Sequence, residues 1–427
     1  MLREEIEEEL LDKSKFRNLV TPDYRNYNFS RIPGTVESVL GLEPDRELPE
    51  DVFEGIDLEE VENVALVFVD AFGYDQWKHY GGELDFFDNM IDKGRVTPLT
   101  AVFPSETSAA VTSMNTGLTP QEHSVFSWRV FFEGLDVTLR TLPFTTLDKE
   151  DPREIDGDVD VSVLFDGENI FERLKAGEVR STAILPEGVH ESEYNSVMME
   201  DAEQEGFTNA FDMALKLRRQ LENSEGLNYF HCYTDQVDSA LHEYGPNSEE
   251  HLSQLEAVSQ ALQKQLLEKI SNEKAEKTLL VVVADHGQAD VDPEGIVDLL
   301  SFGKVRENLR TYENGEPVLP TGGPRTVFLN LEEGSQEEVK SFLEEKLEAK
   351  IYTKSEALEK EFFGLGEVSH PSRLGNLIII PEKEEQMIWY DHEEHSGYGD
   401  YQGHHGGMSR AEMLVPFATA KLSDLKN

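Results

Sequence analysis

The chain of 427 residues is almost free of cysteine. Its one cysteine, Cys232, excludes any disulfide within the chain. Cys232 lies inside the largely apolar stretch Tyr229-Phe230-His231-Cys232-Tyr233, and a free cysteine in such a setting behaves as a small buried hydrophobic residue. The sequence therefore predicts a fold that is held by its core rather than by covalent crosslinks.

Long hydrophobic runs are also missing. No apolar run approaches the roughly 20 residues that a membrane-spanning helix needs. The N-terminal segment Met1-Leu2-Arg3-Glu4-Glu5-Ile6-Glu7 lacks the basic-then-apolar order of a signal peptide. We therefore expect a cytoplasmic protein that makes no membrane contact.

Positive charge is scarce. The chain has 38 Lys and Arg against 86 Asp and Glu, which gives a formal net charge of −48. The acids are dispersed rather than gathered in a tail, as in Glu4 to Glu9 and Glu382 to Glu385. Binding of long nucleic acid rests on Lys and Arg, so this composition argues against it. A dispersed acidic excess is typical of a surface adapted to molar salt. It predicts a halophile with a salt-accumulating cytoplasm; an ordinary acidic enzyme or an acidic mimic of nucleic acid are the alternatives.

What the sequence does contain is a set of apolar runs bounded by turn residues. Such runs predict buried parallel strands, and the segments between them have apolar residues at helical spacing. The pattern indicates an α/β fold: a mostly parallel central sheet with helices on both faces. The expected strands are 63–69, 180–185, 227–234, 278–284 and 376–380, and the longest expected helices are 208–222 and 248–271.

The chain divides into four parts. Residues 1–62 form a leader, with a charged helix near 3–18, that packs on the core or on a partner. The catalytic core occupies 63–302 and resumes at 376–427. Between its two parts, residues 303–375 are predicted to form an inserted α+β unit, called the cap below. The elements expected in the cap are a strand at 325–331, a helix at 335–349 capped by Ser335, and a short strand at Ile351-Tyr352.

Potential metal ligands stand at the ends of two expected strands. Asp70 follows the run that starts at Asn63, and Asp285 and His286 follow the run Leu279 to Ala284. Ligands gather at the carboxyl ends of strands in open α/β sheets. Two strands therefore deliver two carboxylates and an imidazole to one edge of the sheet.

Other candidates have equally specific settings. Asp238 and His242 are four residues apart, so both lie on one face of a helix. His405 lies in Gly403-His404-His405-Gly406-Gly407, where glycines permit close approach of the backbone. Thr107 precedes an expected helix, 108–116, which Gly117 ends. A threonine at a helix start is either an N-cap or a nucleophile that faces an anion site.

Five segments together resemble the alkaline phosphatase superfamily, and within it the type I phosphodiesterase/nucleotide pyrophosphatase family. They occur in the family's order and cover the core from about 63 to 302 and from 376 to 420. The Cys-X-Pro-X-Arg motif of common sulfatases is absent. The matching segments are Val69-Asp70-Ala71-Phe72-Gly73, Phe103-Pro104-Ser105-Glu106-Thr107, Asp238-Ser239-Ala240-Leu241-His242-Glu243-Tyr244-Gly245-Pro246, Ala284-Asp285-His286-Gly287 and Gly403-His404-His405-Gly406-Gly407.

The resemblance implies two divalent metal ions and a threonine nucleophile, Thr107. Carboxylate and imidazole ligands suit zinc, with manganese or iron possible. Paired metals stabilise the entering and leaving oxygens of an in-line displacement, and a water then hydrolyses the phospho-threonine. The implied ligands are Asp70, Thr107, Asp285 and His286 for one metal, and Asp238, His242 and His405 for the other.

Some positions depart from the family pattern or have rivals. Nucleotide pyrophosphatases usually carry an asparagine three residues after the nucleophile, where this chain has Ala110. Backbone amides or Arg129 would have to replace that side chain, so Arg129 and Trp128 are the candidate substrate-binding residues. The remaining alternatives are Ser105 and Ser108 for the nucleophile, His404 for His405, and a supporting or surface role for His392 and His395.

The expected function is metal-dependent hydrolysis of a small anionic substrate at a phosphodiester or nucleotide pyrophosphate bond. A phosphomonoesterase and a phosphonate hydrolase are the alternatives on the same two-metal site. A different class is a PglZ-like component of a larger defence assembly, with residues 1–62 as its docking element. The intact ligand set argues against a scaffold without activity.

Overall fold

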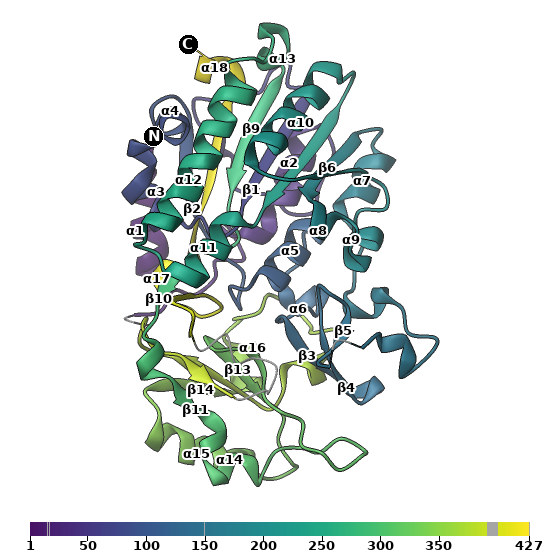
Figure 1. Cartoon of the computed structure of the whole chain (residues 1–427), viewed down its shortest axis with the longest axis vertical. Coiled ribbons are helices and arrows are strands. Elements are labelled where there is room, and N and C mark those ends of the chain that lie inside the picture. The colour runs from purple at the N-terminus through teal and green to yellow at the C-terminus, as the bar shows by residue number, and fades with distance from the viewer. Residues whose placement is uncertain (15, 17, 149, 391–399, 427) are drawn as a thin grey trace.

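The computed structural model describes residues 1–14, 16, 18–148, 150–390 and 400–426. Its centre is a seven-stranded sheet in the order β2-β18-β9-β1-β8-β6-β7 (Figure 1). β1 pairs in parallel with β8 and β9, β6 pairs in parallel with β7 and β8, and β18 pairs antiparallel with β2 and β9. The bounds are β1 Asn63–Val69, β2 Arg95–Thr100, β6 Arg180–Pro186, β7 Glu203–Phe207, β8 Asn228–Thr234, β9 Thr278–Val283 and β18 Leu414–Lys421.

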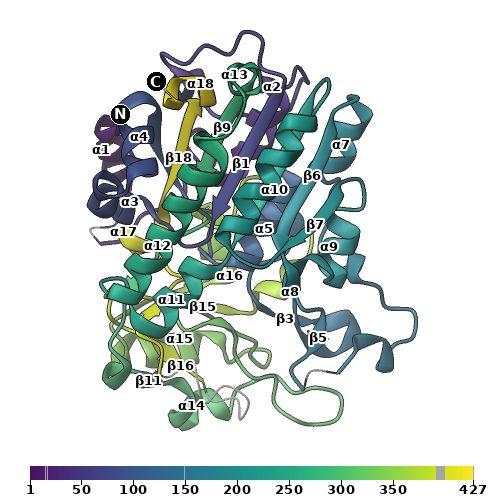
Figure 2. The same cartoon turned by 45° about the horizontal axis from the view of Figure 1, so that its top comes forward.

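Helices cover both faces of this sheet, as the sequence predicts. β1 and β9 are buried along their whole length, as their near-continuous Val and Leu content requires for strands covered on both sides. α10 and α12 lie on one face and α2, α5 and α7 on the other (Figure 2). These helices span α2 Ile32–Val39, α5 Thr107–Thr116, α7 Ile170–Ala176, α10 Ala210–Asn223 and α12 Glu249–Ala261.

The N-terminal residues pack along the edge strand β2. Leu2 bridges to Val96, the Arg3 amide donates to the Val96 carbonyl at 3.0 Å, and Asn28 bridges to Thr100. The first helix, α1, covers Glu4–Lys13 and is shorter than the expected helix at 3–18, because Ser14 is already extended. A role for residues 1–62 in partner binding stays a prediction.

A second, four-stranded antiparallel sheet has the order β12-β13-β15-β14 and its own apolar core. The strand expected at 376–380 exists as β15, but our prediction that it joins the central sheet was wrong. A short apolar run does not reveal which sheet buries it. The elements are β12 Thr321–Gly323, β13 Thr326–Leu329, α15 Gln336–Lys346, β14 Ala349–Thr353, α16 Lys354–Glu359 and β15 Leu377–Pro381.

Two details of the expected helices differ. The helix expected at 248–271 is α-helical only to Ala261 and continues as a π-helix over Leu262–Leu267. Ser335 precedes α15, but its side chain makes no cap and its hydroxyl donates to the Glu332 carbonyl at 2.8 Å. Both differences arise where side-chain contacts, rather than periodicity, decide the last turn.

Three small sheets complete the structure. The first has three strands, β3 Arg129–Phe132, β4 Val137–Arg140 and β5 Thr145–Thr146, and follows α6 Pro120–His123. The second pairs β10 Ala289–Asp290 with β17 Gly403–His404, and the third pairs β11 Val297–Asp298 with β16 Ile388–Trp389. β10 and β17 pair the segment that follows β9 with the glycine-rich loop, residues 403–407, which carries His405.

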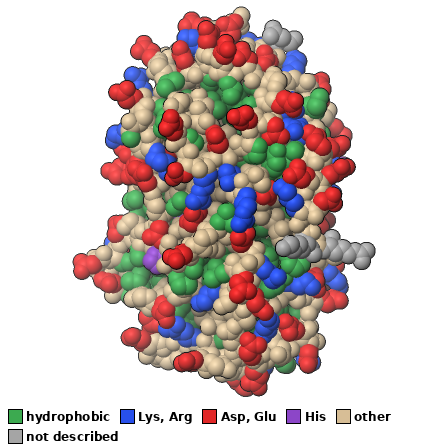
Figure 3. Space-filling view, turned by 180° about the vertical axis from the view of Figure 1, so that it is seen from behind, with side chains coloured by type: hydrophobic (Ala, Val, Ile, Leu, Met, Phe, Trp, Pro, Cys, Tyr) green, Lys and Arg blue, Asp and Glu red, His purple; other side chains and the backbone are tan. Residues whose placement is uncertain are grey.

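The surface agrees with the composition. Acidic side chains are dispersed over the whole face that Figure 3 shows, with no single acidic block. Within the part of the chain that the structure describes, every helix is too short or too polar to cross a membrane.

Candidate active site

The seven candidate residues converge at the carboxyl edge of the central sheet. Asp70 directly follows β1, and Asp285 and His286 follow the adjacent strand β9. Thr107 is the first residue of α5. Asp238 and His242 lie on α11, Gln236–Tyr244, and His405 follows β17. Five segments that are distant in sequence therefore meet at one place.

The deep half of the site consists of Asp70, Asp285 and His286, whose ligand atoms all lie within 4.8 Å of one another. His286 Nε2 is 3.5 Å from Asp70 Oδ1, 3.3 Å from Asp285 Oδ2 and 3.2 Å from Thr107 Oγ1. Asp70 Oδ1 and Asp285 Oδ2 are buried and accept no hydrogen bond. Buried carboxylate oxygens without donors are costly unless a cation binds them, so this half fits a metal ion.

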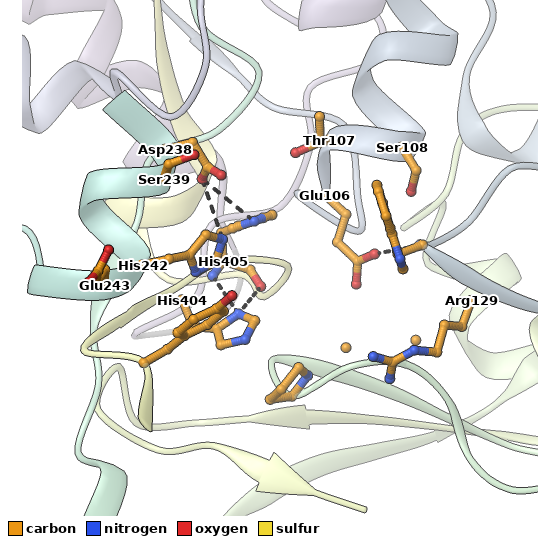
Figure 4. A pocket seen from close by; sticks show the side chains of 15 residues that line it. Glu106, Thr107, Ser108, Arg129, Asp238, Ser239, His242, Glu243, His404 and His405 are labelled. Carbon is orange, nitrogen blue, oxygen red and sulfur yellow. Dashed lines mark hydrogen bonds and ion pairs between the residues drawn. The ribbon is translucent and has the colours of Figure 1, made fainter. Parts of the chain in front are cut away.

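The outer half consists of Asp238, His242 and His405. Asp238 Oδ1 is 3.5 Å from His242 Nε2 and 3.9 Å from His405 Nε2 (Figure 4). The rings of His286 and His405 stack with their centroids 3.6 Å apart. The tightest cluster here is Asp238, His286 and His405, so His286 stands between the halves and His242 lies at the rim.

The imidazoles of His242, His286 and His405 all present Nε2 to the site, because Nδ1 of each is hydrogen-bonded to a backbone carbonyl. Nδ1 lies 2.9 Å from the Gly403 carbonyl in His242, 3.0 Å from the Gly287 carbonyl in His286 and 2.9 Å from the Ser105 carbonyl in His405. Carbonyls only accept hydrogen bonds, so Nδ1 carries the proton and the Nε2 lone pair faces the cluster. Metal-binding histidines are held in this way.

Burial sets the charge states of these groups. It lowers the pKa of His286 to about 4 and that of His405 to about 3, so both rings are neutral and their lone pairs are available. Burial, together with the charges of Asp285 and Asp238, raises the pKa of Asp70 well above its usual range. Burial raises the pKa of Asp285 to about 6. Carboxylates placed this close repel one another, and cations would relieve that repulsion.

The model of the type I phosphodiesterase/nucleotide pyrophosphatase family matches residues 64–408. The chain belongs to this family. No curated protein sequence matches it.

Solved structures similar to this family member agree in fold. An inactive variant of murine ectonucleotide pyrophosphatase/phosphodiesterase 5, in complex with AMP, aligns with a TM-score of 0.60 at 16% identity, over 86% of this chain and 93% of that chain. Phosphonoacetate hydrolase from Sinorhizobium meliloti 1021, in complex with phosphonoacetate, gives 0.61 at 14% identity, over 86% and 94%. The human ectonucleotide pyrophosphatase/phosphodiesterase 5 gives 0.60 at 16% identity, over 85% and 92%. At such identities the likeness shows the alkaline phosphatase-like fold.

Two cavities open onto Thr107 in this family member. The first, of about 470 Å³, is lined by Trp128, Arg129, His242 and His405, among others. In Figure 4, Glu106 and Arg129 reach into it from the side opposite Asp238, His242 and His405. Arg129 is only 5% exposed, so it is not a surface arginine. The second cavity, of about 390 Å³, is lined largely by apolar side chains and is bordered by Asp70 and Asp238.

The rival positions have other contacts. Ala110 is buried and lines neither cavity, so its side chain does not face a substrate at either place. The Ser105 hydroxyl donates to the Gly407 carbonyl at 2.8 Å and accepts from the Gly406 amide at 3.2 Å, which ties it to the loop that carries His405. His404 lines the first cavity and packs its ring 5.1 Å from that of His242. His392 and His395 lie outside the described residues.

Several residues that sequence reasoning missed lie against the candidate ligands or Thr107. The Tyr233 hydroxyl donates to Asp70 Oδ2 at 2.5 Å, and Gln288 Nε2 donates to Asp238 Oδ1 at 2.6 Å. Glu106 is buried beside Thr107 and accepts from the Ser127 hydroxyl at 2.7 Å and the Trp128 amide at 2.9 Å. Burial raises its pKa to about 7. Tyr233 and Gln288 each lie near a candidate ligand in sequence, and that proximity was the available signal.

A buried ion pair holds the glycine-rich loop against the second sheet. Arg325, next to β13, donates from Nε and Nη2 to the two carboxylate oxygens of Glu412 at 3.0 and 2.8 Å. Glu412 also accepts from the Gly407 amide at 2.8 Å and the Ser409 amide at 3.1 Å. The position of His405 therefore depends on contacts with the cap.

Proposed function

We propose that this chain hydrolyses a phosphodiester or nucleotide pyrophosphate bond, with Thr107 as the nucleophile. The observation that carries the proposal is the pair of unpartnered buried oxygens of Asp70 and Asp285, which lie 3.5 and 3.3 Å from the His286 Nε2 atom that is itself 3.2 Å from the Thr107 hydroxyl. Asp70, Thr107, Asp285 and His286 would hold one divalent ion, and Asp238, His242 and His405 the other. Zinc is our first choice, and manganese the second.

The start of α5 prepares the site for a phosphoryl group. Glu106 precedes the helix without capping it, so the amides of Thr107 and Ser108 have no acceptor in the helix or at the cap. Amides at the start of a helix bind anions. We infer that they hold phosphoryl oxygens, and that Arg129 and Trp128 contact the same group from the first cavity.

The reaction proceeds in two displacements. Thr107 Oγ1 gives up its proton to solvent and bonds to phosphorus while the bond from phosphorus to the leaving oxygen breaks, and the leaving alcohol or phosphate takes a proton from solvent. A water oxygen then bonds to phosphorus as the bond to Thr107 Oγ1 breaks, the water's proton restores the hydroxyl, and a phosphomonoester is released. The bound ions would lower the pKa of the hydroxyl and stabilise the charge on the reacting oxygens.

The phosphonate hydrolase remains the second candidate, because the chain has the fold of phosphonoacetate hydrolase at a TM-score of 0.61. Bis(4-nitrophenyl) phosphate, 4-nitrophenyl phosphate and phosphonoacetate, assayed with zinc or manganese in molar KCl, separate the candidates. We expect the diester to turn over fastest. A tenfold preference for the monoester, or turnover of phosphonoacetate alone, would reassign the substrate. No turnover of any of them with two ions bound would contradict the proposal.

The compartment is proposed from the charge alone. A net charge of −48, dispersed over the surface, supports a cytoplasm that accumulates salt. Co-purification of another protein, lost on deletion of residues 1–62, would favour the defence-assembly alternative instead.

A further inference from the structure

The second cavity is lined largely by apolar side chains, but polar side chains line it too. Leu142, Leu185, Val189 and Met199 are among the apolar ones, and His231, on β8, is among the polar ones. Side chains two residues apart share a face of a strand. His231 therefore lies in one row with Tyr229 on one side and Tyr233, the donor to Asp70, on the other. The row leads from the interior of the sheet to the metal ligands.

The tautomer of His231 follows from its partner. The Tyr229 hydroxyl and His231 Nδ1 lie 3.0 Å apart, and both residues are buried. Within the described part of the chain the Tyr229 hydroxyl has this one hydrogen-bonding partner, so its proton is satisfied only if it donates to Nδ1. Burial raises the pKa of Tyr229 and lowers that of His231 to about 4, so both groups are neutral. His231 must then carry its proton on Nε2.

This Nε2 proton has no acceptor among the described residues. Two other polar groups that line the cavity are engaged elsewhere: the Tyr194 hydroxyl lies 2.8 Å from that of Thr112, and Asn195 Nδ2 donates to the Val189 carbonyl at 2.9 Å. No hydrogen bond joins His231 Nε2 to a described residue, and the atom is not sealed from the cavity. A donor without a partner in a largely apolar cavity selects for an acceptor.

We infer that His231, held by Tyr229, is a specificity-determining residue that donates a hydrogen bond from Nε2 to the organic group of the substrate. The inference rests on the proposed function, since it places that ester group in the second cavity. The group it selects is a compact, largely apolar ring with one hydrogen-bond acceptor, such as a ring nitrogen or a carbonyl oxygen. A ring without an acceptor leaves the donor buried and unpartnered, so the site rejects it.

Matched substrates test this selection in the metal-loaded enzyme. 4-Nitrophenyl benzyl phosphate and its three pyridylmethyl analogues share one leaving group and differ only in a ring nitrogen. We expect one pyridylmethyl isomer to exceed the benzyl ester in kcat/KM by roughly tenfold or more. In His231→Phe the ratio should fall to about one, and in His231→Gln, which keeps a donor near the Nε2 position, it should partly return. Because each variant is judged by a ratio, a general loss of activity cancels.

His251→Phe is the matched control. His251 is equally buried, on α12, and lines neither cavity, so its replacement should leave the ratio unchanged. Equal rates for all four esters in the wild type, or a preference that survives in His231→Phe, would overturn the inference. If His231→Phe does not fold, Tyr229→Phe serves, since it removes one hydroxyl and should lower the ratio.

A second readout needs no turnover. In protein labelled with ¹⁵N-histidine, the His231 signal, assigned by its loss in His231→Gln, reports which ring nitrogen carries the proton. We expect the Nε2–H form in the wild type. The Nδ1–H form would overturn the inference even in an active enzyme. If the Nε2–H form is found but the protein has no phosphodiesterase activity, the proposed function is rejected while the assignment of the His231 donor stands.

Discussion

The deep and outer halves of the site are held by different parts of the fold. Asp70, Asp285 and His286 follow two adjacent strands of the central sheet and are at most 2% exposed. Asp238 and His242 lie on a helix, and His405 lies on a loop that is held by contacts from several distant segments. The deep half therefore has the rigidity of the sheet, whereas the outer half depends on distant segments.

Those segments are identifiable. Gln288 fixes Asp238, the Gly403 carbonyl fixes His242, and the Ser105 carbonyl fixes His405. The Arg325–Glu412 pair joins the loop to the cap. Changes in the cap should consequently alter the outer half while leaving the deep half in place. Substrate preference could then change without moving the proposed nucleophile, Thr107.

The largest effect should come from Thr107→Ala, at the boundary of the two halves. Removal of the hydroxyl removes the group that bonds to phosphorus, so we expect kcat to fall by roughly a thousandfold or more. The fold and both metals should remain, measured by melting temperature and metal analysis. Thr107→Ser, which keeps a hydroxyl, should retain part of the activity.

Ser105→Ala is the matched test of the nucleophile. Ser105 holds the loop of His405, so its loss should weaken the outer metal and reduce activity less than Thr107→Ala does. Excess metal should restore part of that activity. If Ser105→Ala abolishes turnover and Thr107→Ala does not, the nucleophile has been misassigned.

The next largest effect should follow from Arg325→Met. This change leaves Glu412 buried without its cation, which should lower the free energy of unfolding by about 3–5 kcal/mol. Urea titration measures it. The double variant Arg325→Met/Glu412→Gln removes both charges and keeps an oxygen for the Gly407 amide, so most of the stability should return.

The same pair of variants tests the independence of the halves. We expect Arg325→Met to weaken the outer metal, since the loop that carries His405 loses its support, and to leave the deep metal bound. Equal loss of both metals would show that the cap supports the whole site and would remove the distinction drawn above.

The deep half could be predicted from sequence and the outer half only in part. Asp70 and Asp285 follow long apolar runs, and the carboxyl ends of such strands meet at one edge whatever else the chain does. The family motifs brought in Asp238, His242 and His405. The burial of Arg129, the Tyr229–His231 pair and the Arg325–Glu412 pair depend on side chains that are close only after folding, and no local pattern marks them.

β15 illustrates the same limit in the fold. Leu377 to Ile380 predict a buried strand, and one forms, but pairing partners come from tertiary context. β2, β7 and β18 were missed. β7, Glu203–Phe207, has little apolar content because it is an edge strand, so periodicity gives no signal there.

Salt should stabilise the protein by screening its surface charges, whereas metal ions should stabilise it by neutralising the deep carboxylates. The Debye length is ~30 Å at 0.01 M salt and ~3 Å at 1 M, so molar KCl removes most repulsion among surface acids. Buried carboxylates are screened much less, so Asp70 and Asp285 need the ions themselves. We expect the melting temperature to rise with KCl, and metal to raise it further at every KCl concentration.

Melting curves against KCl, with and without chelator, separate these contributions. A melting temperature of the metal-free protein that stays flat from 0.1 to 3 M KCl would rule out the halophile proposal. Curves with and without metal that coincide would instead argue that the deep carboxylates are not relieved by a bound ion.

The smallest effects should come from two matched changes, one in each half. Tyr233→Phe removes the hydroxyl that donates to Asp70, and Gln288→Leu removes the amide that donates to Asp238. Loss of such a supporting contact typically lowers metal affinity about 10- to 100-fold. Tyr233→Phe should therefore weaken binding of the deep ion and Gln288→Leu binding of the outer ion, each measured by competition with a chelator of known affinity.

The two losses of affinity should differ. Because Asp70 is held at the end of a central strand, its carboxylate should stay in place without the hydroxyl, and we expect the loss of affinity for the deep ion to lie nearer tenfold. Asp238 stands on a short helix at the rim, so its change should be the greater. A larger loss in Tyr233→Phe would show that the sheet does not by itself fix the deep ligands.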